Sequence, residues 1–357
     1  ATRRIPEPLL GEIRSAGAIR MPMPAAWGGP ELDPLAQVRV IAELAAHDPS
    51  AGWIAMICCD GGYYTGFLRD DATARDLYPD IDLLTSGQVA PVGRAEIVDG
   101  GHRVSGRWQF GSGILHADRI VGGALVTRGG ELVFDGDLPR FRVFFLPTES
   151  VEVHDTWHTT GLAGTSSNDY SVTDAFVPEG HDFSPFSRGY RDEPLYAYHG
   201  LFFAKLVGIG LGALRRAIEE FRTLAETKAP APTFRPIKND YRVQVAIAEA
   251  QADLDAMWGL VDGTLGRLWD TLTAGRQPTM EQRAAVGAMG VWVAQSAKRA
   301  VDSLCAEAGT DSIFATNALE RLRRDVTTMT HHLAAQRKTY QVVGQLQLGV
   351  EPTFAIF

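Results

Sequence analysis

The stretch VQVAIAEAQADLDAMWGLVDGTLGRL, residues 243–268, decides the fold class of this chain. Its apolar residues recur at steps of three and four positions, which places them on one face of an α-helix. A second stripe with the same period runs from Val286 to Leu304. Helices of about 30 residues are roughly 45 Å long, a length typical of an antiparallel helical bundle and not of a doubly wound sheet. The first stripe consists of Val243, Ile247, Ala250, Leu254, Met257, Val261, Leu265 and Leu268.

The region before these helices has a different period. Two alternating runs flank Asp99-Gly100-Gly101, a pattern that predicts a β-hairpin, and further short strand-like runs follow the hairpin. Before the hairpin, residues 35–48 and 48–68 predict two helices. The predicted fold class is therefore α+β and mainly α. The predicted domains are an N-terminal helical domain (1–83), a β-barrel-like middle domain of antiparallel strands (84–195) and a C-terminal helical bundle (196–357).

Composition narrows the range of partners. The 357 residues carry a formal net charge of −9, so the chain lacks the basic face that a nucleic acid or an anionic membrane needs. The longest apolar segment, residues 201–214, is too short to span a bilayer and is interrupted by Lys205. Three cysteines, two of them adjacent, give no disulfide framework. We therefore expect a reduced, cytoplasmic protein that binds neither nucleic acid nor membrane.

Three motifs suggest chemistry that their surroundings do not support. GIGLGA (208–213) lies between helical flanks, so its glycines indicate close helix packing and not a dinucleotide loop. His154 and His158 are four apart in a strand or loop, where that spacing does not bring two metal ligands together. GTSSND (164–169) lacks the strand-to-helix turn of a serine nucleophile. We expect no metal site.

Aromatic and glycine-rich stretches occur twice in the predicted β domain. SGRWQFGSG (105–113) combines Trp108 and Phe110 with a Ser-Gly pair, and residues 155–169 add Trp157 and a second loop of glycines and hydroxyls. Flat apolar side chains next to backbone and hydroxyl donors suit a planar ligand that forms hydrogen bonds. A core tryptophan followed by a tight turn is the alternative interpretation.

Several motifs together resemble the acyl-CoA dehydrogenase fold. They are most similar to its oxygenase branch, the flavin-dependent monooxygenases of two-component systems, and the resemblance runs from about residue 5 to 350. The resemblance implies an N-terminal helical domain, a middle antiparallel β domain and a C-terminal four-helix bundle, assembled as a homotetramer. The motifs are AAWGGPELD (25–33), DPSAGWIAM (48–56), VDGGHRVSGRWQFGSG (98–113), DTWHTTGLAGTSSNDYSVTDAFVPE (155–179) and LERLRRDV (319–326).

One departure from the dehydrogenases favours the oxygenase branch. Many acyl-CoA dehydrogenases carry a catalytic glutamate shortly after an Arg-Asp pair, here Arg324-Asp325. The equivalent segment, residues 329–336, contains no glutamate and has Leu333 near that place. The alternatives are an FAD-dependent acyl-CoA dehydrogenase with its base elsewhere, an oxygenase acting on nitrogen or sulfur, and an interaction protein without a cofactor.

The resemblance also implies site residues. In the oxygenase branch a serine of the Trp-x-x-x-Ser-Gly element lies near flavin N5, which Ser112 matches, and a histidine faces flavin C4a. The apolar face of the helix over 319–329 continues to position 332 and not to His331, so His332 is the predicted catalytic histidine. The predicted cofactor contacts are Gln88, Trp108, Phe110, Ser112, Gly113 and Trp157, and the predicted substrate contacts are Trp53, Tyr63 and Tyr64.

The implied reaction is a hydroxylation. A separate NAD(P)H-flavin reductase would supply FMNH2 or FADH2, and molecular oxygen would form a flavin C4a-hydroperoxide. The expected substrate is a small aromatic or polycyclic phenol. Trp258 and Trp292 lie beside the main helical stripes, which leaves apolar surface for the partner subunits of the tetramer.

Overall fold

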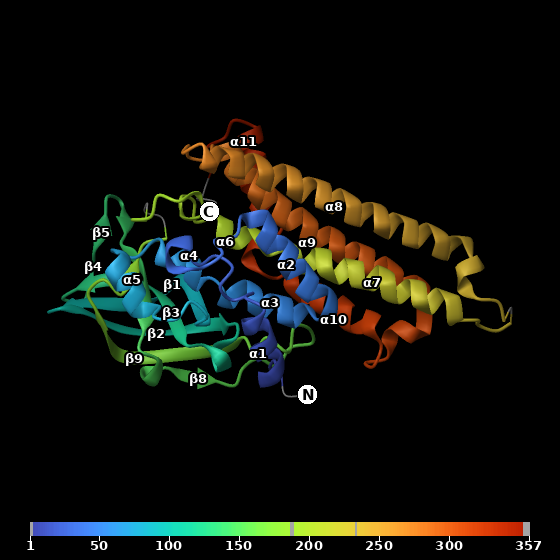
Figure 1. Cartoon of the computed structure of the whole chain (residues 1–357), viewed down its shortest axis with the longest axis horizontal. Coiled ribbons are helices and arrows are strands. Elements are labelled where there is room, and N and C mark those ends of the chain that lie inside the picture. The colour runs from blue at the N-terminus through green and yellow to red at the C-terminus, as the bar shows by residue number, and fades with distance from the viewer. Residues whose placement is uncertain (1–2, 186–188, 233, 353–357) are drawn as a thin grey trace. The chain divides into compact units, whose positions relative to one another are not determined.

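The computed structural model describes residues 3–185, 189–232 and 234–352, which form two compact units (Figure 1). The first unit comprises Ala1–Asp33, Ile54–His158 and Ala163–Phe202, and the second comprises Pro34–Trp53, Thr159–Leu162 and Phe203–Phe357. The units differ from the three consecutive domains that we predicted, because residues 34–53 join the C-terminal helices. No helix among the described residues is long and apolar enough to cross a membrane.

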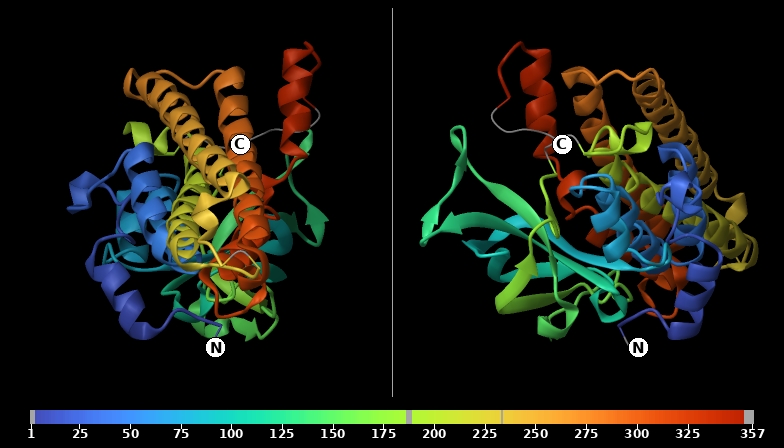
Figure 2. Two further views of the ribbon diagram at one scale, coloured as in Figure 1. Left: turned by 90° about the vertical axis from the view of Figure 1, so that its right-hand side faces the viewer. Right: turned by 60° about the vertical axis from the view of Figure 1, so that its left-hand side comes forward.

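The first unit is built on one large sheet, whose strands are coloured teal to green in Figure 2. The order of its strands is β10-β7-β3-β1-β2-β9-β8, with β4 paired to β3, and β5 and β6 form a separate pair. The strands are β1 (Thr85–Val98), β2 (Gly101–Gly111), β3 (Arg119–Arg128), β4 (Glu131–Leu132), β5 (Phe134–Asp135), β6 (Leu138–Pro139), β7 (Phe141–Leu146), β8 (Glu152–His154), β9 (Asn168–Pro178) and β10 (Asp182–Phe183).

The predicted hairpin is confirmed, and one strand pair departs from the predicted antiparallel arrangement. Strands β1 and β2 pair from Val98–Gly101 onward, and Gly100 at the turn has a φ of 73°. After β2 the short helix η2 (Ile114–His116) carries the chain to the other side of β1. There β3 starts opposite Thr85 and runs parallel to β1, because β2 has already returned the chain to the start of that strand.

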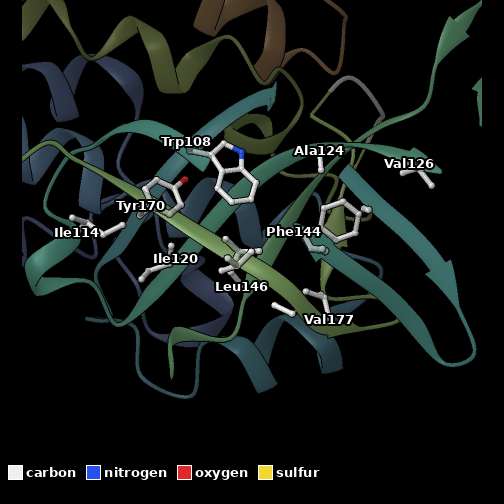
Figure 3. Packing of buried hydrophobic residues seen from close by; sticks show 13 residues of the cluster. Trp108, Ile114, Ile120, Ala124, Val126, Phe144, Leu146, Tyr170 and Val177 are labelled. Atoms are coloured by element: carbon white, nitrogen blue, oxygen red, sulfur yellow. The ribbon is translucent and has the colours of Figure 1, made fainter. Parts of the chain in front are cut away.

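One buried apolar cluster of the first unit lies on one face of this sheet (Figure 3). Trp108 and Tyr170, from the paired strands β2 and β9, stack with ring centroids 5.4 Å apart and have no exposed surface. The Trp108 indole N–H donates to the Gly123 carbonyl over 2.8 Å, and the Tyr170 hydroxyl donates to the Val121 carbonyl over 2.5 Å. Two large aromatic groups are therefore buried with their polar atoms satisfied, as a stable core requires.

Short helices of the first unit surround a charged aromatic cluster. The Trp27 ring lies between the guanidinium groups of Arg75 and Arg191, at 4.9 Å and 5.0 Å. Asp71 accepts hydrogen bonds from the Trp27 indole and from both arginines. The tryptophan of the AAWGG motif thus has a structural role. The helices are α1 (Glu7–Ser15), η1 (Ala25–Trp27), α4 (Gly61–Thr65), α5 (Asp71–Leu77) and η4 (Pro194–Tyr196), with η3 (Thr148–Ser150) beside β8.

The predicted helix over 48–68 is interrupted. Helix α3 (Pro49–Cys58) passes from the second unit into the first, and α4 begins only at Gly61. The predicted helix over 35–48 is confirmed as α2 (Pro34–His47).

The second unit is a bundle whose long helices lie side by side (Figure 1). The stripe of residues 243–268 forms α8 (Tyr241–Thr273), and α9 (Met280–Ala308) follows after a short loop. Gly212 of α7 allows that helix to approach α2, since a Cβ there would lie 2.2 Å from the Ala42 carbonyl oxygen. GIGLGA is therefore a helix-packing motif, as predicted. The remaining helices are α6 (Leu201–Ala204), which begins in the first unit, α7 (Val207–Thr227), η5 (Ile237–Asn239), η6 (Gly309–Ile313), α10 (Ala318–Met329), η7 (Leu333–Ala335) and α11 (Thr339–Gln347).

Candidate functional site

The end of β2 presents an aromatic side chain on a strained backbone. Phe110 has a φ of 65°, a conformation that costs a bulky residue about 1–3 kcal/mol. Its ring is 56% exposed and meets Trp157 edge to face, with centroids 6.3 Å apart. An exposed aromatic side chain on strained backbone, in contact with a half-buried tryptophan, is typical of a ligand-binding surface.

Polar contacts within the first unit hold the loop segment that carries Trp157, residues 155–157. Asn168 accepts through Oδ1 from the backbone N–H groups of Thr156 and Trp157, at 3.1 Å and 3.0 Å. Arg3 donates to the Trp157 carbonyl and to the Asp155 carboxylate. The indole therefore projects from a fixed backbone, which a binding surface needs.

Ser112 is fixed by three segments of the first unit. Its backbone N–H donates to the Phe110 carbonyl, and its own carbonyl accepts from the Ser86 hydroxyl, each over 2.8 Å. Its side chain shares a 2.7 Å hydrogen bond with Ser167, which shares another of 2.7 Å with Thr165. Three buried hydroxyls thus form a chain that begins beside Phe110.

The residue after Ser112 must be glycine for two reasons. Gly113 has a φ of 75°, which disfavours other residues, and a Cβ there would lie 2.7 Å from Cys58 Sγ. Its backbone N–H donates to the Thr165 carbonyl over 2.8 Å. Gly113 therefore lets the Ser112 turn lie against both the Cys58 thiol and the loop that carries Thr165.

One predicted cofactor contact requires correction, and the backbone N–H of a second already has a partner in the first unit. Trp108 is not on the ligand surface, because it is fully buried in the sheet core with its N–H satisfied. The backbone N–H of Gln88 is also occupied, since it donates to the Tyr170 hydroxyl over 2.7 Å. The Gln88 side-chain oxygen accepts from the Ala90 N–H over 3.3 Å, so its second lone pair and the side-chain nitrogen are the groups that could contact a cofactor.

The two adjacent histidines differ in burial, although not for the predicted reason. Helix α10 ends at Met329, so the helical phase does not reach position 332. His332 instead adopts an extended backbone and caps η7, where its Nδ1 accepts from the Ala334 N–H over 3.2 Å. His331 is exposed, whereas His332 is part-buried.

His332 lies in an aromatic pocket of the second unit. The Trp53 ring meets it edge to face at 5.5 Å, and the Phe203 ring lies at 6.4 Å. Burial lowers the pKa of His332 to about 4, so the ring is neutral at pH 7. Because Nδ1 is an acceptor, the single proton of the neutral ring is on Nε2. His332 is therefore arranged as a hydrogen-bond donor.

The predicted substrate tyrosines are core residues of the first unit. Tyr63 is fully buried, and Tyr64 is 5% exposed with its ring 4.9 Å from that of Phe183. Burial raises the pKa of the Tyr64 hydroxyl well above its usual value. The third predicted substrate contact, Trp53, meets the predicted site residue His332 in its own unit.

The motif search missed a carboxylate that holds a loop. Asp325, only 5% exposed, accepts from the Leu162 N–H over 2.6 Å. Arg324 donates to the Thr160 carbonyl, and a Cβ on Gly161 would lie 2.2 Å from the Arg324 carbonyl oxygen. The Arg-Asp pair therefore fastens residues 159–162 to α10. Burial is the main cause that raises the pKa of Asp325 to about 6.

The two histidines weighed as metal ligands have other partners. His154 shares a hydrogen bond with Ser171, and His158 lies 3.6 Å from Asp155. Across the described ranges, no group of three or more His, Cys, Asp or Glu side chains is placed to hold a metal ion.

Comparisons with known proteins agree with this architecture. The family model described as acyl-CoA dehydrogenase, C-terminal domain, matches residues 205–337. Indole-3-acetate monooxygenase of Pseudomonas putida is 30% identical over 358 residues, covering 98% of this chain and 89% of that protein. The flavin-dependent monooxygenase, oxygenase subunit HsaA, of Rhodococcus jostii is 27% identical over 368 residues, covering 98% and 94%. The crystal structure of 3-HSA hydroxylase from Rhodococcus sp. RHA1 superposes with a TM-score of 0.90 at 26% identity, covering 99% of this chain and 93% of that one.

Proposed function

The chain belongs to the flavin-dependent monooxygenases of the acyl-CoA dehydrogenase fold, and from this membership we propose that it hydroxylates a small aromatic or polycyclic phenol. It uses reduced flavin and molecular oxygen, as the oxygenase component of a two-component system. The observation that carries the proposed site is the edge-to-face contact between the half-buried Trp157 and the exposed, strained Phe110, which is two residues before Ser112.

The residues of the first unit fit a flavin. The apolar faces of Phe110 and Trp157 suit a flat ring system, and the Ser112 hydroxyl and the Gln88 side-chain nitrogen suit its polar atoms. Gly113 keeps the turn free of a side chain that would displace Cys58. When bound, reduced flavin supplies the electrons that activate oxygen for transfer to the substrate. The role that we propose for Ser112 is a hydrogen bond to flavin N5.

In this proposal His332 acts as a hydrogen-bond donor and not as a general base. Its pKa of about 4 keeps it neutral at working pH, and its Nδ1 already accepts from Ala334. The Nε2–H group would stabilise negative charge that develops at the flavin C4a side during oxygen transfer. Trp53 and Phe203 exclude water around the ring, which strengthens such a hydrogen bond.

A dehydrogenase activity is less well supported. It needs a carboxylate base where residues 329–336 supply none, and Leu333 in that segment is 49% exposed. Asp325 is the nearest carboxylate along the chain, and its Oδ1 is occupied by the Leu162 N–H.

The proposed partners follow from the same function. Reduced flavin comes from a separate NAD(P)H-flavin reductase, and the substrate is a small molecule. We further propose that the enzyme is a cytoplasmic homotetramer. Its three cysteines are buried thiols that form no disulfide, as is common in a reducing compartment.

The test combines the purified protein with reductase-generated FMNH2 or FADH2, a panel of phenols and ¹⁸O-labelled oxygen. We expect one labelled oxygen atom in the product, and no oxidation of NADH by this protein without the reductase. NADH consumption without a reductase would contradict the two-component assignment. Labelled product from thioethers or amines, but not from phenols, would reassign the substrate class.

A further inference from the structure

Asn168, the first residue of β9, closes a β-bulge in β2. Strand β2 pairs with β9 at Trp108–Tyr170 and next at Gly111–Asn168, so two residues of β2 lie opposite one residue of β9. Phe110 is the second of these two residues, and its backbone has a φ of 65°. A bulge re-aims the side chains of its strand. The bulge therefore accounts for the exposed position of the Phe110 ring, and the Asn168 backbone fixes the point where regular pairing resumes.

On its other side, Asn168 binds the segment that follows β8. Strand β8 ends at His154, which pairs with Asp169, and the next residues leave the sheet with backbone N–H groups that still need acceptors. The Asn168 Oδ1 accepts from the N–H groups of Thr156 and Trp157, the first of which is shared with the His154 carbonyl. The Thr156 hydroxyl in turn accepts from the Asp169 N–H over 2.9 Å. Side chains therefore hold the Trp157 segment against β9 where backbone pairing has ended.

One buried residue thus contacts both segments that carry the aromatic side chains of the proposed site. Asn168 is 5% exposed, and hydrogen bonds are stronger in such surroundings than in water. Arg3 also contacts the Trp157 segment, but its ion pair with Asp155 is largely exposed, and such pairs contribute little.

We infer that Asn168 is a positioning residue for the flavin. Its backbone places Phe110, its side chain places Trp157, and the two rings are held at one spacing for the flavin ring system. The inference rests on the proposed contact of these two rings with flavin.

Substitutions separate the side chain of Asn168 from its backbone. Asn168→Ala keeps the backbone pairing with Gly111 but removes the acceptor for the Thr156 and Trp157 N–H groups. Residues 155–157 then gain freedom, and the flavin must order the indole when it binds. Asn168→Asp has nearly the same shape as asparagine and keeps an oxygen that accepts from both N–H groups.

The experiment measures dissociation constants for oxidised FMN and FAD, and anaerobically for the dithionite-reduced forms. For Asn168→Ala we expect the dissociation constant to rise by roughly twofold to tenfold, the range for ordering one side chain on binding. Asn168→Asp should remain near the wild-type value. A loss of affinity in Asn168→Asp as large as in Asn168→Ala would overturn the inference, because the acceptor would then not be the group that matters.

A double-mutant cycle with Trp157→Ala distinguishes positioning from a general loss of structure. If Asn168 acts through Trp157, Asn168→Ala should not raise the dissociation constant further in the Trp157→Ala background. It should still lower the free energy of unfolding in urea in both backgrounds. An equal rise of the dissociation constant in both backgrounds would contradict the positioning role.

Ser171→Ala is the matched control. Its hydroxyl also joins β9 to β8, through His154, but within the regularly paired part of the sheet, so flavin affinity should not change. Circular dichroism verifies folding, and Asn168→Ser, whose shorter side chain cannot reach both N–H groups, decides the question if Asn168→Ala does not fold. If Phe110→Ala and Trp157→Ala both leave flavin affinity unchanged, the proposed flavin site itself is wrong. If these two variants weaken binding and the Asn168 variants do not, only the role of Asn168 is wrong.

Discussion

His331 and His332 are neighbours in sequence with different surroundings, and this makes them a matched pair for mutagenesis. His332→Asn keeps an oxygen that can accept from the Ala334 N–H, because asparagine is a good N-cap, but it loses the Nε2–H donor. We expect product formation to fall by roughly a hundredfold or more, while reduced flavin still binds. Coupled assays with a reductase measure product and peroxide separately.

The control is His331→Asn. His331 is exposed, so its replacement should change stability by about 0.5 kcal/mol or less and leave hydroxylation intact. Loss of activity in His331→Asn alone would exchange the roles of the two histidines. Full activity in both variants would remove His332 from the site.

Gly113 allows a second test at the scale of one residue. Gly113→Ala must adopt a φ of 75° and place a methyl group 2.7 Å from Cys58 Sγ. We expect a loss of about 1–3 kcal/mol in the free energy of unfolding, from strain and steric overlap together. In Gly113→Ala with Cys58→Ala, the overlap is removed and the backbone strain remains. The double variant should therefore lose less than the sum of the two single variants, measured by urea denaturation.

At the scale of elements, the sequence predicted the helices and the hairpin, whose apolar residues recur at a regular period. The stripe over 243–268 became α8, and Asp99-Gly100 became the turn between β1 and β2. The end of α10 was missed because no glycine or proline marks it, and the Thr330 N–H donates to the carbonyl groups of the last helical turn. Trp108 was misassigned because an alternating strand does not reveal which of its faces is covered.

The candidate site was only partly predictable, because its contacts join segments that are distant in sequence. Ser112, Phe110 and Trp157 are visible as a motif, but the partners of Ser112 depend on which loop crosses the end of β2. Ser167 and Thr165 lay within the loop of glycines and hydroxyls over 155–169, but the pattern did not show that their side chains bond to Ser112. The density of hydroxyls in GTSSND was the available signal.

The burial of Asp325 predicts a pH dependence, because it raises the pKa of this carboxyl group although the Leu162 N–H opposes the shift. The folded pKa of Asp325, about 6, exceeds the usual value near 4, so the folded protein holds this proton more tightly than the unfolded chain. The stabilisation from this group is full below about pH 4 and is lost as the pH rises through 6, by about 2–3 kcal/mol. Asp325→Asn should remove this loss, because a neutral amide oxygen still accepts from Leu162.

Thermal midpoints of both proteins at several pH values between 4 and 8 measure the difference. We expect the thermal midpoint of Asp325→Asn to increase relative to that of the wild type as the pH rises. Asp325→Ala, which leaves the Leu162 N–H without its acceptor, should be less stable than Asp325→Asn throughout. A constant difference between Asp325→Asn and the wild type across this range would show that Asp325 has an ordinary pKa.

At the scale of the whole molecule, assembly is the first question. Tyr241 and Val245 lie one turn apart on α8 and are 73% and 42% exposed. Apolar side chains exposed at this spacing favour contact with another subunit. We predict a homotetramer by light scattering at micromolar concentration. If this face of α8 forms a subunit contact, the double variant Tyr241→Ser, Val245→Glu should have a lower molecular mass in solution. A monomeric wild-type protein would contradict the prediction.

The division of the chain into two units also constrains how it is made. Helix α2 packs on α7, but the ribosome must synthesise more than 150 further residues before α7 exists. Residues 159–162 likewise cannot form their contact with α10 until residues 318–329 have been synthesised. Contacts that join such distant positions form slowly, so the newly made N-terminal part leaves the apolar face of α2 unpaired until α7, which ends at Thr227, has been synthesised. Neither unit is a continuous piece of the gene, and recombination could not exchange one without cutting the other.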